Sequence, residues 1–299
     1  MRMRVQKVID LFKQQETTLS FEFFPPKEAS HLDSFYHVVE ELVNLGADFI
    51  SVTYGAGGST REKTMNVTVE LQNRFDISVI HHITCVGHSK QDLVEILDTM
   101  KTNGIINLLA LRGDPPRGVK KWVPDPDGFS YAYQLCDLVS NHYRGDFSCG
   151  VAGFPEGHPE APNKEVDLKY LKNKMDHGGE FIITQLFYEN NDYFDYTSRV
   201  REIGVTNRVI PGILPVFNFT NLKKFCSFCG ATIPQHFYEI FGPLEDDLKA
   251  TQEKGIELAV KQCVDLLKGG APGLHFYTLN KLDPIKRIVS DLREALNIL

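Results

Sequence analysis

The sequence has too few cysteines for a disulfide-rich fold. Its 299 residues include six cysteines, far below the density of small proteins held together by disulfides. Cys226 and Cys229 form a C-x-x-C, but no second ligand pair at zinc spacing accompanies it. The metalloprotease motif H-E-x-x-H is absent as well. We therefore expect structural or incidental thiols, no metal site, and a protein of a reducing cytoplasm.

The chain also lacks an excess of positive charge and any long apolar run. Its net charge is −7, whereas nucleic-acid binding needs a basic surface. No apolar run approaches the roughly 20 residues that cross a bilayer, and the N-terminal stretch lacks the apolar region of a signal peptide. We expect neither nucleic-acid nor membrane partners. An anionic small ligand stays compatible with this charge, since a few local cations can hold one.

What the sequence does contain is a regular alternation of short apolar runs and longer amphipathic segments. The runs are rich in Val, Ile, Phe and Leu, as expected of strands buried on both faces. They predict eight strands, at 18–24, 49–55, 78–84, 106–114, 148–154, 181–188, 209–216 and 274–280. Helical patterns follow them, at 32–46, 90–104, 127–143, 165–179, 192–204, near 220–228, near 245–268 and at 284–296. Gly46 and Ser89 are suited to a C-cap and an N-cap of these helices.

Repeated strand-then-helix units without a linker predict one (β/α)8 TIM barrel over residues 1–299. A doubly wound sheet is the alternative, but it would normally show fewer strands or a clear second domain. Active sites of TIM barrels lie at the C-terminal ends of the strands. Polar residues gather at those ends in this sequence: Glu22, Thr53, Tyr54, His82, Thr84, Arg112, Asp114, His158, Gln185 and Asn280.

Glu22 is the most unusual of these residues, because SFEFFPPK (20–27) places one carboxylate among three phenylalanines. Alternation along a strand puts Phe21 and Phe23 on the face opposite to Glu22. If the phenylalanines pack against helices, Glu22 points into the barrel mouth. A partly dry mouth would favour its protonated form and make it a proton donor. The alternative is a structural carboxylate neutralised by a buried arginine or lysine.

Three other motifs allow both a functional and a structural interpretation. LRGDPP (111–116) is either a ligand pocket, in which Gly113 permits close approach to the backbone, or a turn with an internal ion pair between Arg112 and Asp114. The glycines of YGAGGST (54–60) either surround a phosphate or form a plain strand-to-helix turn. His81 and His82 alternate in direction, so only one can face the barrel interior.

Seven segments resemble methylenetetrahydrofolate reductase and occur in the order of that family. They are SFEFFPPK, SVTYGAGGST, LRGDPP, FPEGHPEA, ITQLFY, PGILPV and LHFYTLN, and they span residues 18 to 281. The resemblance implies a flavin-binding (β/α)8 barrel. It also implies that NADH or NADPH reduces bound FAD and leaves. The reduced flavin then converts the folate substrate, 5,10-methylenetetrahydrofolate, to 5-methyltetrahydrofolate, which feeds methionine synthesis.

The resemblance further implies roles for individual residues. Glu22 matches the general acid, Asp114 an aspartate near the flavin and the folate, and Gln185 a glutamine that contacts folate and nicotinamide in turn. The expected substrate-binding residues are Glu22, Asp114, Gln185, Phe219 and Lys281. The expected cofactor-binding residues are Thr53, Tyr54, Ala56, His82, Leu111, Arg112, Gly113, Asp114, Tyr131, Ala132, Ala152, Phe154, His158, Ala161, Asp167, Tyr170, Asn173 and Lys174.

Four of these positions depart from the family pattern. Phe154 stands where some members have tyrosine, so a hydroxyl contact is lost while stacking is kept. Tyr170 and Asn173 replace an asparagine and an arginine that contact FAD in some bacterial members. Lys281 stands where an arginine often meets the substrate, which keeps the charge but loses the bidentate fork.

The sequence ends soon after the last predicted helix, as in the short bacterial members of the family. We therefore expect no C-terminal regulatory domain and no feedback inhibition by S-adenosylmethionine. We also expect a homo-oligomer. Two other hypotheses are a flavin-free barrel that transfers one-carbon units on a pterin or folate, and a non-catalytic subunit of a larger redox complex. The retained Glu22, Asp114 and Gln185 argue against the second of these.

Overall fold

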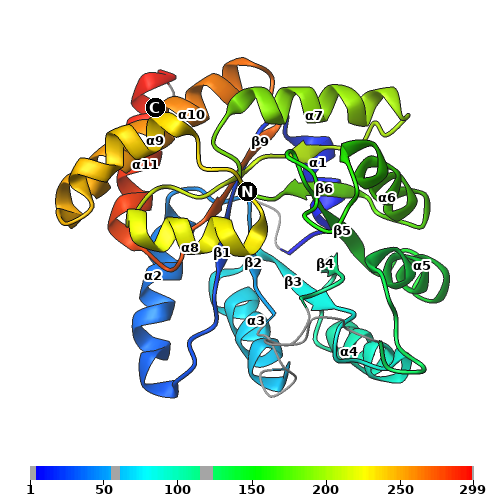
Figure 1. Ribbon diagram of the computed structural model, residues 1–299. Coiled ribbons are helices and arrows are strands. Elements are labelled where there is room, and N and C mark those ends of the chain that lie inside the picture. The colour runs from blue at the N-terminus through cyan, green and yellow to red at the C-terminus, as the bar shows by residue number, and fades with distance from the viewer. Residues whose placement is uncertain (1–4, 55–60, 115–123, 298–299) are drawn as a thin grey trace.

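The chain folds into a β barrel surrounded by helices, which confirms the predicted fold class (Figure 1). This computed structural model describes residues 5–54, 61–114 and 124–297. The described residues form nine parallel strands: β1 (Thr18–Phe23), β2 (Phe49–Val52), β3 (Ser78–Thr84), β4 (Asn107–Leu111), β5 (Ser148–Gly153), β6 (Phe181–Thr184), β7 (Val209–Ile210), β8 (Gly212–Ile213) and β9 (Gly273–Tyr277). All eight predicted strands are present, although the C-terminal ends of most of them come earlier than predicted from the apolar runs.

The extra strand arises because Pro211 divides the seventh barrel strand into β7 and β8. The first half pairs with β6 and the second half pairs with β9. Proline has no N–H to give to the ladder, so it interrupts the pairing. Its carbonyl still accepts the N–H of His275 at 3.0 Å. The two halves together close the barrel between β6 and β9, as an eight-stranded barrel requires.

The helices alternate with the strands along the chain and surround the barrel (Figure 1). They are α1 (Val8–Gln14), α2 (Leu32–Asn44), α3 (Arg61–Phe75), α4 (Lys90–Thr102), α5 (Ala132–His142), α6 (Lys164–Asp176), α7 (Asn190–Glu202), α8 (Phe219–Cys229), α9 (Gln235–Phe241), α10 (Leu248–Lys268) and α11 (Leu282–Ala295). Ser89 caps α4 in a capping box with Asp92, and Gly46 follows α2 with a φ of 90°, as its glycine C-cap requires. The helical patterns in the sequence did not include α1, α3 or α9, although the turn expected at 54–60 implied a helix after it.

Alternation along β1 separates its side chains into two environments, as predicted. Phe21 and Phe23 point outward into the main core between barrel and helices, where Phe23 meets Phe35 of α2 edge-on. Ser20 and Glu22 point into the barrel, where both contact His275 of β9. The period-two pattern of β1 therefore sends the phenylalanines to the core and leaves the carboxylate inside.

Helix α1 closes the N-terminal end of the barrel (Figure 1). The backbone N–H groups of Val8 and Ile9 donate to Asn107 Oδ1 at 2.8 Å and to Ser148 Oγ at 3.2 Å. One apolar cluster joins the helix to side chains inside the barrel: Val8, Leu11, Phe12, Phe49, Ile80, Leu109, Phe181, Ile183 and Ile210. The barrel interior is thus filled and dry at one end, which leaves the opposite rim for ligands.

Replacing Phe12 should measure how much this closure stabilises the fold. The ring is 5% exposed and meets Phe181 and Phe49 edge-on at centroid distances of 5.5 and 6.0 Å. Phe12→Ala should lower the free energy of unfolding by about 3–5 kcal/mol in urea denaturation, because it leaves a cavity in a packed cluster. Phe228→Ala, at an 81% exposed position on α8, is the control and should change stability by less than about 0.5 kcal/mol. Equal effects of the two substitutions would show that α1 does not close the barrel.

Candidate active site

Glu22 lies near the C-terminal end of β1, is 6% exposed, and faces the barrel interior as predicted. Its Oε2 accepts a long hydrogen bond from Ser51 Oγ at 3.5 Å. The same oxygen lies 3.5 Å from His82 Nε2 and 3.6 Å from His275 Nε2. Among the described residues, the ion-pair partners of Glu22 are these two histidines, and no arginine or lysine pairs with it. The carboxylate therefore sits among groups that can exchange a proton, rather than beside a fixed cation.

His275 is a member of this cluster that sequence reasoning missed. It is fully buried on β9, with Nδ1 2.8 Å from Ser20 Oγ and Nε2 3.4 Å from Ser51 Oγ. The two serine hydroxyls orient the imidazole with its Nε2 edge toward Glu22. The alternation of LHFYTLN was a usable signal, because it places His275 on the same strand face as Tyr277.

His82 is the histidine of β3 that faces the interior, whereas His81 points outward to α3. Burial lowers the pKa of His82; the nearby Glu22 carboxylate opposes that effect and His275 adds to it. In the described part of the chain, the buried Nε2 of His82 has no hydrogen-bond partner. A neutral imidazole with an unsatisfied nitrogen can form a hydrogen bond with a polar ligand.

Three basic side chains come together where β4 and β5 end. The Arg112 guanidinium forms a two-pronged ion pair with Glu160, with Nη2 2.8 Å from Oε1. Burial lowers the pKa of His158, and the Arg112 and Lys174 charges lower it further. Lys174 donates from Nζ to the carbonyl of Ala152 at 2.5 Å. The lowered pKa favours the neutral form of His158, so the cations here are Arg112, already paired with Glu160, and Lys174.

Lys174 is also coupled to Asp167 on the same helix, α6. Burial lowers the pKa of the Lys174 amine, while the Asp167 charge raises it. Burial raises the pKa of Asp167, which Lys174 and a hydrogen bond from the backbone of His158 oppose. Lys174 Nζ lies 5.8 Å from the ring centroid of Phe154, and this ring meets His158 edge-on at 4.7 Å. Four predicted cofactor residues therefore surround one point of the rim.

The structure changes the interpretation of LRGDPP. Arg112 pairs with Glu160 of FPEGHPEA and not with Asp114, which is exposed at the end of β4. Gly113 has a φ of 84°, and a Cβ there would lie 2.8 Å from Cβ of Thr84. Glycine is therefore required by the local backbone and by the neighbouring strand, whether or not a ligand approaches. The proposed internal ion pair is replaced by a link between two rim loops.

Other predicted residues lie around the same rim. Thr53 donates its backbone N–H to Phe23 O at 3.0 Å, and the Tyr54 hydroxyl lies 2.9 Å from His88 Nε2. Gln185 follows β6, and its Oε1 accepts the N–H of Leu186 at 2.9 Å. Lys281 is exposed directly before α11. Leu111 is the last residue of β4, Ala161 lies in the loop after β5, and Ala56 falls outside the described residues.

Some predicted positions are less well placed to hold a ligand. Phe219 is 2% exposed and packs against Tyr238 and Phe241 of α9, so a ligand would stack on it only after α8 and α9 move apart. Tyr131 and Tyr170 are more than half exposed. Ala132 begins α5, and the Asn173 carbonyl lies 2.8 Å from the ring of His177.

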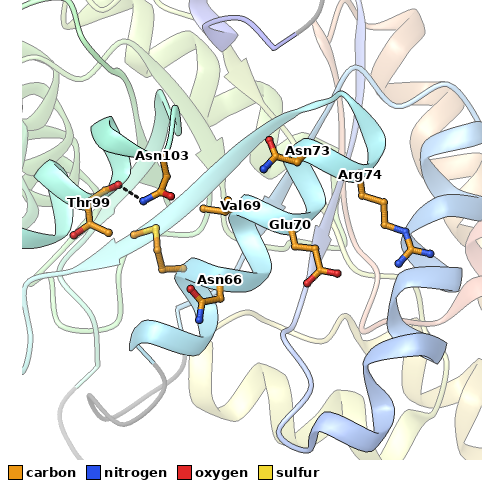
Figure 2. A pocket seen from close by; sticks show the side chains of 8 residues that line it. Asn66, Val69, Glu70, Asn73, Arg74, Thr99 and Asn103 are labelled. Atoms are coloured by element: carbon orange, nitrogen blue, oxygen red, sulfur yellow. Dashed lines mark hydrogen bonds between the residues drawn. The ribbon is translucent and has the colours of Figure 1, made fainter.

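A groove outside the barrel, between α3 and α4, is unrelated to this rim (Figure 2). Its labelled side chains in Figure 2 are Asn66, Val69, Glu70, Asn73, Arg74, Thr99 and Asn103. Glu70 is engaged by the hydroxyl of Tyr36, and Asn103 donates to the carbonyl of Thr99 at 2.8 Å. The groove contains no cluster of catalytic groups.

Two kinds of site are not found in the described residues. No helix there is long and apolar enough to cross a membrane. The same residues contain no group of three or more His, Cys, Asp or Glu side chains that could hold a metal ion.

The closed strand order and the polar C-terminal rim define a (β/α)8-barrel protein with an enzyme-type site. A family model described as methylenetetrahydrofolate reductase matches residues 4–293. The chain is 34% identical over 270 residues to the 5,10-methylenetetrahydrofolate reductase of Escherichia coli (strain K12), covering 90% of this chain and 88% of that protein. The chain therefore belongs to the methylenetetrahydrofolate reductase family.

Two further comparisons extend this result. The chain is 35% identical over 285 residues to methylenetetrahydrofolate reductase (NADH) 1 of Arabidopsis thaliana, covering 92% of this chain and 48% of that protein. The chain thus spans about half the length of its plant relatives. An uncharacterized protein from Clostridium thermocellum that binds two copies of 5-methyl-5,6,7,8-tetrahydrofolic acid has the same fold, with a TM-score of 0.64 at 15% identity. That match covers 97% of this chain and 98% of the other.

The outward His81 predicts how stability depends on pH. Burial, with a smaller effect of His82, lowers the pKa of His81 to about 3. The unfolded chain takes up a proton at this residue below about pH 6.5, and the folded protein does not until near the lower value. Stability should therefore be complete above about pH 6.5 and fall as the pH drops toward about 3.

His81→Gln should lose less stability than the wild type between about pH 7.5 and about pH 5, measured by urea denaturation. The exposed His142→Gln on α5 is the control and should keep the wild-type pH dependence. An unchanged pH dependence in His81→Gln would mean that His81 is protonated as easily in the folded protein as in the unfolded chain.

Proposed function

We propose that this chain is a flavin-dependent reductase that converts 5,10-methylenetetrahydrofolate to 5-methyltetrahydrofolate with NADH or NADPH, in support of methionine synthesis. The proposal includes the assignment of the single barrel, residues 1–299, as the catalytic domain. The observation that carries it is the burial of Glu22 among Ser51, His82 and His275 at the rim where this fold places active sites.

The rim residues fit FAD. The Nε2 of His82 lies 3.5 Å from Glu22 Oε2 but makes no hydrogen bond among the described residues, so it offers a polar contact deep in the rim. Arg112 and Lys174 offer positive charge to a diphosphate, the neutral imidazole of His158 offers a hydrogen bond, and Phe154 offers an aromatic face. When bound, FAD would take a hydride from the nicotinamide and pass it to the folate, so that the two partners use one site in turn. Relatives named for NADH and for NADPH both occur, so either nicotinamide suits the proposal.

Glu22 acts in this proposal as the proton donor to the folate. Opening the five-membered ring of methylenetetrahydrofolate breaks the bond between its methylene carbon and N10. A proton on N10 is needed as the bond breaks, and an iminium is left at N5. Glu22 supplies that proton, and Ser51 and His275 keep its carboxyl group in place. Buried imidazoles suit this role better than a lysine, which would hold the carboxylate ionised.

The exposed polar residues of the rim orient the substrate. Asp114 accepts hydrogen bonds from the pterin, and Gln185 offers an amide to the folate or the nicotinamide. Lys281, exposed before α11, offers a cation to the carboxylates of the glutamate tail. Phe219 joins them only in a conformation in which α8 has moved from α9.

The visible spectrum of the purified protein tests the flavin assignment. We expect a yellow protein, or a colourless one that takes up added FAD and is bleached by NADH or NADPH under anaerobic conditions. A protein that binds folate but takes up no FAD would instead support a flavin-free one-carbon transfer barrel.

Glu22→Gln should separate the two half-reactions. We expect it to bind FAD and to be reduced by NADH or NADPH at the wild-type rate, because Glu22 acts only on the folate. Its rate of methylenetetrahydrofolate reduction should fall by at least about 100-fold, as expected for loss of a general acid. Stopped-flow absorbance of the flavin measures both steps. Glu253→Gln, which breaks the surface pair with Arg287, is the matched control, and near-normal folate reduction by Glu22→Gln would refute the acid role.

Asp114→Asn tests the rim beyond Glu22. The substitution keeps the size of the side chain and removes the charge. We expect a fall of about 10-fold in kcat/KM for methylenetetrahydrofolate, because a charge-assisted contact to the pterin is lost. The dissociation constant of FAD, measured by fluorescence quenching, should change less than that. A larger effect on FAD than on folate would assign Asp114 to the cofactor alone.

A further inference from the structure

The end of β1 is held by a side chain that takes the place of a strand. The ladder between β1 and β9 ends with Glu22 opposite Tyr277. Phe24 lies two residues beyond Glu22, and its backbone forms two hydrogen bonds with the side-chain amide of Asn280. Its Oδ1 accepts the Phe24 N–H at 3.1 Å, and its Nδ2 donates to the Phe24 carbonyl at 2.8 Å. The amide thus continues the sheet pairing beyond the last residue of β9.

Neighbouring hydrogen bonds hold Glu22 and Phe23, the last two residues of β1. The Thr278 hydroxyl donates to the carbonyl of Glu22 at 2.6 Å and accepts the N–H of Asn280 at 3.0 Å. From the β2 side, the Thr53 N–H donates to the carbonyl of Phe23 at 3.0 Å. The backbone on both sides of the Glu22 side chain is therefore fixed, and most of this restraint comes from the segment after β9.

The segment adopts an unfavourable backbone conformation to make these bonds. Leu279 and Asn280 have φ values of 48° and 57°, in the left-handed region that residues with a Cβ rarely enter. Asparagine tolerates this region, whereas leucine is a clear outlier. Leu279 is held there by packing against the main core. Strain of this kind persists only where the surroundings impose it, and it is concentrated at functional sites.

We propose that Asn280 is a positioning residue for Glu22, and that the strained turn at 279–280 exists to aim its amide at Phe24. This rests on the proposed function, in which Glu22 is the proton donor. The contacts of the carboxylate with Ser51, His82 and His275 are 3.5–3.6 Å long, at the outer limit of hydrogen bonding. A small shift of the β1 end would therefore lengthen or break them.

Asn280→Ala removes the amide, and Asn280→Gly removes it while relieving the backbone strain. Both variants should reduce methylenetetrahydrofolate about 10- to 100-fold more slowly, since a misplaced catalytic group has an effect of this size. The loss should lie in kcat rather than KM, with unchanged flavin reduction by NADH. Asn280→Asp keeps an acceptor for the Phe24 N–H and should recover part of the rate. Wild-type folate reduction in Asn280→Gly would overturn the proposal, because relief of strain alone would then suffice.

A second measurement does not depend on activity. The ¹⁵N chemical shifts of the His82 and His275 rings report the tautomer, protonation and hydrogen bonding of the nitrogens that face the Glu22 carboxylate, and both should change in Asn280→Ala and Asn280→Gly. The ring of His81, on the outer face of β3, should not change. Asn297→Ala is the matched control, because Asn297 is another left-handed asparagine, with a φ of 54°, and follows α11.

The two measurements separate the two proposals. Changed ring shifts in a protein whose wild type does not reduce methylenetetrahydrofolate would leave Asn280 as the positioning residue and refute the proposed function. Ring shifts that stay at their wild-type values in both Asn280 variants would overturn the positioning role, whatever happens to turnover.

Discussion

The closed ladder of parallel strands is the constraint on which the rest of this structure depends. Because every barrel strand runs the same way, all C-terminal ends meet at one rim, and residues far apart in the sequence become neighbours. Ser51, His82 and His275 come from three different strands and reach one carboxylate oxygen of Glu22 within 3.6 Å. Helix α1 fills the opposite end of the barrel, and Pro211 interrupts one strand without opening the ring.

Within that frame, the environment of Glu22 decides what the site can do. A buried carboxylate costs several kcal/mol unless its surroundings compensate. A buried lysine or arginine would compensate this cost and keep the carboxylate ionised. Arg112 pairs in this way with the more exposed carboxylate of Glu160. Hydroxyl and imidazole groups contact Glu22 instead, and no fixed positive charge of the described residues pairs with it. The same rim thus contains a fixed ion pair that joins two of its loops and a buried carboxyl group, which we propose as the acid.

Much of this was predictable from local patterns. Strand alternation correctly separated Glu22 from Phe21 and Phe23, and it predicted that only one of His81 and His82 faces the interior, since a period of two needs no tertiary information. Helix α1 was not predicted, because seven residues give little periodicity and its stability comes from contacts with distant strands. The Arg112 to Glu160 pair was missed because it joins two loops, whose geometry the sequence does not specify. The burial of Phe219 under α9 was missed for the same reason, as α9 itself was not recognised.

Family membership and geometry support the same account from independent directions. The family suggests the substrate, and the rim supplies a buried carboxyl group, the Arg112 and Lys174 cations and the aromatic face of Phe154. The most direct test is the balance between the two substrates in the FAD-loaded wild-type protein. NADH oxidation and 5-methyltetrahydrofolate formation should be measured together under anaerobic conditions. The account predicts one molecule of 5-methyltetrahydrofolate for each NADH or NADPH oxidised. Oxidation of the nicotinamide without any methylated folate would contradict it.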